Sequence, residues 1–177
     1  MRIISGIHKG RKIIAPQKLP VRPTADRAKE SLFNILRNNY VFSQVNVLDL
    51  FAGTGNISFE FASRGVPEVI AVDENSGCVR FIAETAEKLE MPIETIKSDV
   101  FDHLKFTSHS FDIIFADPPY DLDQSIFLSI IDLVFEKNRL KEGGMLVMEH
   151  GKHTDLSTHS HFNEIRNYGS SAFSFFG

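Results

Sequence analysis

The chain has 177 residues, of which 42% are hydrophobic, and it carries a formal net charge of −4 with a single cysteine, Cys78. These values fit one globular domain with a full core, exclude an internal disulfide framework and favour a reducing compartment. No apolar run approaches the roughly 18 residues needed to cross a membrane, and the first residues lack the apolar segment of a signal peptide. We therefore expect a cytoplasmic monomer without membrane contact.

The charge is unevenly distributed along the chain. Residues 1–37 hold nine lysines and arginines but two acids, a net charge of +7, whereas the remaining residues carry −11. A basic arm on an acidic body is typical of polyanion binding, although a solvated charged surface is the simpler alternative. The residues expected to contact a nucleic acid are Lys9, Arg11, Lys12, Arg22, Thr24 and Arg27.

The first elements are a hairpin and a helix. Two short β-prone runs, residues 2–5 and 11–15, flank a loop with glycine at both ends, which predicts a β-hairpin. Apolar residues at three- and four-residue spacing predict a helix over residues 25–38, with Thr24 as its N-cap. We expect residues 1–39 to form a basic RNA-binding extension packed on a main domain, residues 40–177.

Strands and helices alternate in the main domain. Helices are expected over residues 56–64, 76–90 and 123–137, and strands over residues 45–50, 69–72, 93–97, 111–116, 145–149, 162–168 and 172–176. The last two strands are separated by Gly169-Ser170, which predicts a terminal hairpin. This order predicts an α/β fold with a mainly parallel, doubly wound sheet of seven strands, one of them antiparallel.

A glycine-rich turn follows the strand at residues 45–50. Gly53 and Gly55 suit a close approach of backbone to ligand, and Asp73 ends the next strand, where a carboxylate can accept ribose hydroxyl groups. Phe51 and Ser58 replace two glycines of the dinucleotide pattern, which argues against a diphosphate. Asp49 suits the ammonium group of an amino-acid moiety, so these residues favour S-adenosylmethionine. A tight turn without a ligand is the alternative.

The stretch Asp117-Pro118-Pro119-Tyr120 ends the strand at residues 111–116. Ligands of doubly wound sheets bind outside the carboxyl ends of the strands, so this stretch is expected at a site. The Asp117 carboxylate and the Pro118 carbonyl offer two acceptors beside the Tyr120 ring, which suits a planar amino group that stacks on an aromatic face. Aspartate and proline are also common in ordinary turns, which is the competing interpretation.

Histidines and the lone cysteine are not spaced like metal ligands. His153, His159 and His161 lie in a polar, loop-like stretch, where a chance surface cluster explains them better than a metal site. We therefore expect no metal.

Several motifs, taken together, resemble one family. Asp49–Asn56 and Asp117–Tyr120 resemble motifs I and IV of S-adenosylmethionine-dependent amino-methyltransferases. The opening is more specific: Arg2-Ile-Ile-Ser-Gly, Gly10-Arg-Lys, Arg22-Pro-Thr-Ala-Asp-Arg27 and Glu30-Ser-Leu-Phe-Asn34 resemble the RsmD family, which methylates the N2 amino group of a guanine in 16S ribosomal RNA. The likeness covers nearly the whole chain, apart from the closing segment, which matches no motif residue by residue.

The resemblance implies a Rossmann-like methyltransferase fold with S-adenosylmethionine as cofactor and 16S ribosomal RNA, free or within the small subunit or its assembly intermediate, as partner. It implies a cofactor site formed by Asp49, Phe51, Gly53, Gly55, Asp73 and Asp99, with Asp99 facing the adenine amino group, and catalysis by Asp117, Pro118, Pro119 and Tyr120. Two alternatives stay open. One is a DNA adenine-N6 methyltransferase, although the chain has no room for a target-recognition domain, and the other is a non-catalytic RNA-binding or assembly protein.

Overall fold

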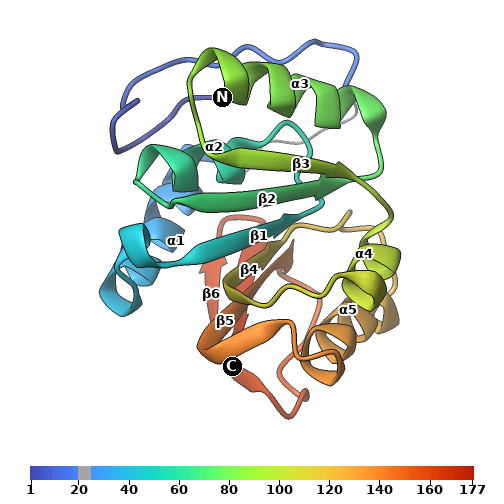
Figure 1. Cartoon of the computed structure of the whole chain (residues 1–177). Helices are drawn as coiled ribbons and strands as arrows, with labels where there is room; N and C mark the ends of the chain where they lie inside the picture. Colours follow the sequence, from blue (N-terminus) through green and yellow to red (C-terminus); the bar gives the residue numbers. More distant parts are fainter. Residues whose placement is uncertain (20–24) are drawn as a thin grey trace.

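The computed structural model describes residues 1–19 and 25–177, so Arg22 and Thr24 lie outside the described residues. A seven-stranded sheet with the order β3-β2-β1-β4-β5-β7-β6 forms its centre (Figure 1). The strands are β1 Asn46–Leu50, β2 Glu68–Asp73, β3 Ile93–Lys97, β4 Phe111–Ala116, β5 Leu140–Gly151, β6 Phe162–Tyr168 and β7 Ser171–Phe176. The helices are α1 Asp26–Asn39, α2 Asn56–Ser63, α3 Ser76–Lys88, α4 Val100–Phe106 and α5 Gln124–Glu136, with a 3₁₀ turn, η1, at Phe42–Gln44.

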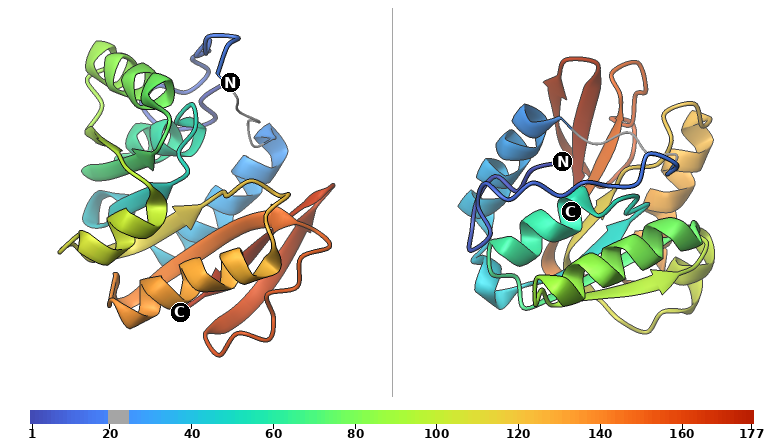
Figure 2. Two further views of the ribbon diagram at one scale, coloured as in Figure 1. Left: turned by 90° about the vertical axis from the view of Figure 1, so that its right-hand side faces the viewer. Right: turned by 90° about the horizontal axis from the view of Figure 1, so that it is seen from above.

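The predicted topology is confirmed. Strands β1 to β5 pair in parallel, and β7 runs antiparallel to both of its neighbours, β5 and β6. Strands β3 and β6 are the two edges, and the sheet twists between them (Figure 2).

Each face of the sheet has its own core, because side chains alternate between faces along a strand. Residues 47, 69, 71, 113, 115, 147, 173 and 175 pack with apolar residues of α1, α2 and α3. Residues 48, 50, 70, 72, 114, 116, 146 and 148 pack with α4 and α5. The same alternation, continued to the strand ends, decides which polar side chains share a face at the site.

The N-terminal segment pairs with itself only briefly. Arg2 and Lys12 form one antiparallel bridge, and the amide of Ile3 donates to the Arg11 carbonyl over 3.0 Å. The predicted hairpin is therefore present as a bridge and not as two full strands. Gly6, with φ +86°, lies so close to the Ser63 carbonyl that a β-carbon would meet the oxygen at 1.7 Å, so this contact requires glycine.

A buried ionic network holds the N-terminal segment and α1 against α2. Glu60 of α2 accepts the amides of Ile4 and Ser5 over 2.9 and 3.0 Å and pairs with Arg64. The Lys29 ammonium lies 3.3 Å from Glu60 and donates to the Arg2 carbonyl and to Asn56. Burial lowers the pKa of Lys29, and Glu60 offsets part of that shift. One of the nine N-terminal cations is therefore internal and cannot meet a polyanion at the surface.

Three other expectations differ from the structure. Helix α1 begins at Asp26, with Ala25 at the N-cap position and without a side-chain cap. Helix α4 was not expected, since seven residues give too short a pattern to recognise. Strand β5 starts at Leu140, ahead of the expected Met145, and a register shift between Phe111 and Ile113 accommodates the added residues. In the part of the chain that the structure describes, no helix is both long and apolar enough for a membrane span.

Candidate active site

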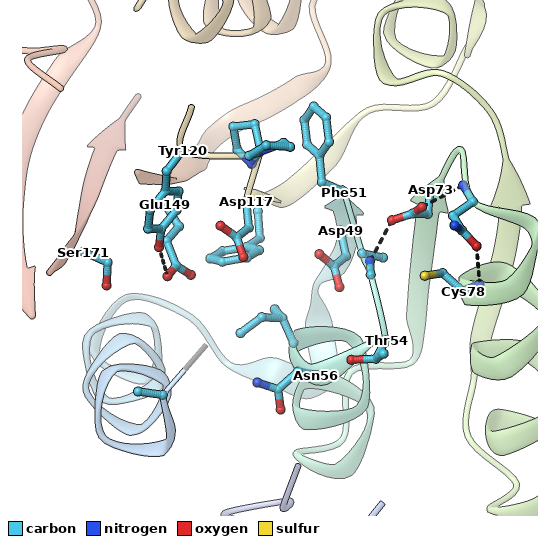
Figure 3. Close-up of a pocket in the computed structure, with 18 of the residues that line it drawn as sticks. Asp49, Phe51, Thr54, Asn56, Asp73, Cys78, Asp117, Tyr120, Glu149 and Ser171 are labelled. Atoms are coloured by element: carbon cyan, nitrogen blue, oxygen red, sulfur yellow. Dashed lines mark hydrogen bonds between the residues drawn. The ribbon is translucent and has the colours of Figure 1, made fainter. Parts of the chain in front are cut away.

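Four carboxylates share one face at the carboxyl ends of four strands. Asp49, Asp73, Asp117 and Glu149 all fall on the odd-numbered face of β1, β2, β4 and β5, the face that α1 to α3 cover. Where α2 starts beyond the strand ends, this face opens into a cavity of about 730 Å³ that all four residues line. Figure 3 shows Asp73, Asp49, Asp117 and Glu149 in this order across it.

The cavity is acidic. Its described lining includes six carboxylates, the four above with Glu74 and Asp121, and no lysine, arginine or histidine. A negative, partly enclosed cavity attracts cations and groups rich in hydrogen-bond donors, and it repels phosphate groups.

The turn after β1 is strained and firmly held. Phe51 has φ +58°, a left-handed conformation that is unusual for a bulky residue, and Gly53 and Gly55 have φ +55° and +78°. The Ala52 amide donates to the Val72 carbonyl over 3.0 Å, and the Gly55 amide donates to the Ala52 carbonyl over 2.7 Å. Strain of this kind is typical of a backbone shaped around a ligand.

Asp73 braces this turn. One carboxylate oxygen accepts the Gly53 amide over 2.8 Å, and the other accepts the Asn75 amide over 2.8 Å. Because each carboxylate oxygen can accept two hydrogen bonds, Asp73 keeps acceptor capacity toward a hydroxyl pair while it fixes the turn.

Asp49 is deeply buried, with 2% of its surface exposed. Its Oδ2 accepts a hydrogen bond of 2.5 Å from the Ser58 hydroxyl. Burial raises the pKa of Asp49 to about 7, although the Ser58 hydrogen bond opposes this shift. A cation bound beside Asp49 would restore its ionised form, so the carboxylate is suited to bind an ammonium or sulfonium group.

Two predicted cofactor residues do not line the cavity. Gly55 serves the packing of α2, since a β-carbon there would lie 2.8 Å from Ile82 and 3.0 Å from Phe59. Asp99 follows β3, and its carboxylate accepts the Asp102 amide as the N-cap of α4. The other predicted residues of the cofactor and catalytic sets, Asp49, Phe51, Gly53, Asp73, Asp117, Pro118, Pro119 and Tyr120, all line it.

The end of the cavity opposite Asp73 holds further polar residues, Glu149 and Ser171, which were not among the predicted site residues. The Tyr120 hydroxyl donates to Glu149 Oε1 over 2.5 Å, and Ser171 of β7 also hydrogen-bonds this hydroxyl. Burial and the neighbouring Glu149 carboxylate raise the pKa of Tyr120. Glu149 follows the apolar residues 145–148 near the end of β5, much as Asp117 follows β4, so the rule that ligands bind at strand ends could have found it. Ser171 carries no such signal, because the turn before it gives no hint of a site.

Comparison with known proteins agrees with this geometry. The family described as Conserved hypothetical protein 95 matches residues 1–177. Ribosomal RNA small subunit methyltransferase D of Haemophilus influenzae is 32% identical over 163 residues, which cover 89% of this chain and 82% of that protein. The chain belongs to this family, the RsmD family.

Solved structures of similar proteins show the same fold. The yhhF protein of Escherichia coli has a TM-score of 0.86 at 25% identity, over 99% of this chain and 96% of that chain. A hypothetical protein of Thermus thermophilus has a TM-score of 0.86 at 27% identity, over 99% of this chain and 98% of that chain. The RsmD-family chain therefore has the S-adenosylmethionine-dependent methyltransferase fold, and S-adenosylmethionine is its cofactor.

The cavity fits that cofactor. S-adenosylmethionine carries a sulfonium, an ammonium and a ribose diol but no phosphate, which agrees with a lining rich in carboxylates. We infer that Asp73 and Gly53 hold the ribose and that Asp49 faces the cationic end. In the part of the chain that the structure describes, no group of three or more His, Cys, Asp or Glu side chains is arranged to hold a metal ion.

Proposed function

We propose that the protein methylates the exocyclic N2 amino group of a guanine in 16S ribosomal RNA. The observation that carries this proposal is the position of Asp117-Pro118-Pro119-Tyr120, which lines one cavity together with the cofactor-turn residues Phe51 and Gly53. Family relatives named as small-subunit ribosomal RNA methyltransferases support RNA as the substrate.

A guanine amino group is a poor nucleophile, because its lone pair is delocalised into the ring. The Asp117 carboxylate and the Pro118 carbonyl would each accept one of its two N–H bonds, which favours a pyramidal nitrogen with a localised lone pair. Pro118 and Pro119 stiffen the turn and thereby hold both acceptors in place. The bound cofactor supplies an electrophilic methyl group on its sulfonium. After transfer, the surplus proton on the nitrogen leaves to Asp117 or to water.

Tyr120 would stack on the target base, with its ring held by the hydroxyl contact to Glu149. The base must be displayed outside a helix to enter the cavity.

The basic extension would hold RNA phosphates outside the cavity. Lys9, Arg11, Lys12 and Arg27 are exposed, and none of them takes part in an ion pair with another described residue. We also propose residues 1–39 as the RNA-binding unit, with Arg22 and Thr24 as further contacts. An acidic cavity beside a basic extension separates the two tasks: the extension binds the backbone, and the cavity binds the base.

The test compares methyl transfer from labelled S-adenosylmethionine to naked DNA, to free 16S RNA and to small ribosomal subunits. The proposal expects label in one or both RNA samples and none in DNA. Label in DNA would favour adenine-N6 methylation, which uses the same Asp-Pro-Pro-Tyr chemistry. Binding of RNA without transfer to any sample would favour a non-catalytic assembly protein.

A further inference from the structure

Glu149 is buried in the active-site cavity, yet the transfer chemistry assigned to Asp117 and Pro118 does not use it. It is 3% exposed and lines the cavity together with Asp117 and Tyr120. A buried carboxylate is costly unless polar partners compensate it, and the Tyr120 hydroxyl is one such partner.

The register of the sheet puts Glu149 beside Asp117. Ala116 of β4 pairs with Met148 of β5, so Asp117 and Glu149 are the next residues along two adjacent parallel strands. Neighbouring strands lie about 4.8 Å apart, and both side chains project to the same face. In Figure 3 the two carboxylates lie side by side in the cavity, with Glu149 farther from Asp49 and Asp73.

Contacts with Tyr120 and with strand β7 hold the Glu149 side chain in place. The Tyr120 hydroxyl donates to Oε1 over 2.5 Å, and Glu149 is held in the sheet by its pairing with Phe173 of β7. A carboxylate has about four acceptor positions, so the bond from Tyr120 does not exhaust it.

The Watson–Crick edge of guanine matches two adjacent acceptors. It presents two neighbouring donors, the N2 amino group and the N1–H. Adenine has an acceptor at N1, which a carboxylate at that point would repel. A site built to accept a substrate N–H rejects an analogue that lacks it, because a buried acceptor then stays unpaired.

We propose that Glu149 selects guanine by accepting the N1–H of the target base while Asp117 and Pro118 hold its N2 amino group. This inference rests on the proposed function and deepens it. It assigns Glu149 a role in specificity, with Tyr120 as the residue that positions its carboxylate.

The test uses 16S RNA in reconstituted small subunits, with either guanine or 2-aminopurine at the position that the wild-type protein methylates. 2-Aminopurine keeps the 2-amino group but has an acceptor at N1. The wild-type protein should favour guanine in kcat/KM by roughly tenfold or more, the discrimination typical of a good bidentate base contact. In E149Q the amide can donate to N1, so this preference should shrink about tenfold or reverse.

Glu164→Gln is the matched control. Glu164 lies on β6, where its side chain is 40% exposed and pairs with Arg166, so this variant should keep the wild-type preference. Calorimetry with S-adenosylmethionine checks that each variant keeps a folded cofactor site.

Each other outcome has a definite meaning. Equal methylation of both bases by the wild-type protein, a result that needs no variant, would overturn the role of Glu149 and leave the proposed function intact. An equal loss of methyl-transfer activity on both bases in E149Q would mean that Glu149 only supports Tyr120. That result would also overturn its proposed role in selecting guanine. Absence of N2-methylguanosine from the wild-type reaction would overturn both proposals.

Discussion

At the residue scale, Asp117 carries the proposed chemistry, because it faces the cavity from the end of β4. Replacing Asp117 by alanine removes an acceptor that the transition state needs. Loss of one preorganised group of this kind typically lowers kcat by about 10²- to 10³-fold. We expect a loss of this size in methyl transfer with S-adenosylmethionine affinity nearly unchanged, measured by radiolabel incorporation and calorimetry. Asp123→Ala, an exposed change nearby, should leave both values as in the wild type. A parallel loss of cofactor binding in D117A would contradict the role in transfer.

Asp49 gives cofactor binding a predicted pH dependence. Its pKa is about 7 without a bound cation, so the carboxylate is mostly protonated at pH 6 and mostly ionised at pH 8. If the ionised form binds the cationic end of S-adenosylmethionine, affinity should fall about tenfold per pH unit below the pKa. Binding at pH 6 should release a proton, which calorimetry detects in buffers of different ionisation enthalpy.

Asp49 also makes the stability of the protein depend on pH, but in the opposite direction: its contribution to stability falls as pH rises, whereas cofactor affinity increases. The pKa of Asp49 in the folded state lies above its value in the unfolded state, so the folded protein binds the proton more tightly. The contribution of this proton to the free energy of unfolding is therefore largest below about pH 4. It is lost as pH rises through about 7.

Asp49→Asn should remove the pH dependence of cofactor binding. An affinity that is flat between pH 6 and 8 in the wild-type protein would show that Asp49 does not pair with the cofactor.

At the element scale, Glu60 ties the N-terminal segment to α2. It is fully buried and contacts the amides of Ile4 and Ser5 as well as Lys29 and Arg64. Glu60→Ala leaves the buried Lys29 ammonium without its carboxylate, a loss that typically costs about 3–5 kcal/mol. We expect a lower midpoint in urea unfolding and faster hydrogen exchange at Ile4 and Ser5. Glu87→Ala, on the exposed face of α3, should change neither. Unchanged exchange at Ile4 and Ser5 would show that other contacts hold the segment.

The extension should account for most of the salt dependence of RNA binding. Each phosphate neutralised on a single strand contributes a log–log slope of about −0.7. Replacing Lys9, Arg11 and Lys12 together by alanine should therefore flatten the slope by roughly two units and leave cofactor affinity intact, as filter binding across salt concentrations would show. The matched control removes Lys88, Lys105 and Lys137, which are exposed on other elements. A wild-type slope in the first triple variant would mean that the extension is only a solvated surface.

Sequence patterns predicted the elements of the sheet well, since alternation and glycine punctuation are local signals. They did not predict features that depend on contacts between residues far apart in the sequence. The hairpin is reduced to one bridge because Gly6, Ile4 and Ser5 contact α2 instead of completing a ladder. The contact of Asp99 with the cofactor stays a prediction, and its role as the cap of α4 could not be foreseen because that helix is too short to predict. Glu149 meets Tyr120 through the pairing of β4 with β5, and Ser171 reaches them through the pairing of β5 with β7, a contact that no local pattern encodes.

At the scale of the whole molecule, charge and topology work together. The four carboxylates gather on one face because each has an odd number near the carboxyl end of β1, β2, β4 or β5, and the adjoining cavity lacks described basic residues. The exposed cations Lys9, Arg11, Lys12 and Arg27 lie instead on the N-terminal segment and the start of α1, which pack against the same face of the sheet. An RNA held by its phosphates on the extension would thus present a base toward a cavity that favours hydrogen-bond donors.

The identity of the methylated nucleoside decides whether the protein modifies guanine N2. Small ribosomal subunits that lack the modification are incubated with the wild-type protein and S-adenosylmethionine, the 16S RNA is digested to nucleosides, and the methylated nucleoside is identified by mass spectrometry against standards. We predict N2-methylguanosine in the wild-type reaction and a severe loss of it in D117A. A methyl group on adenine N6, on another guanine atom or on a pyrimidine would contradict methylation of guanine N2.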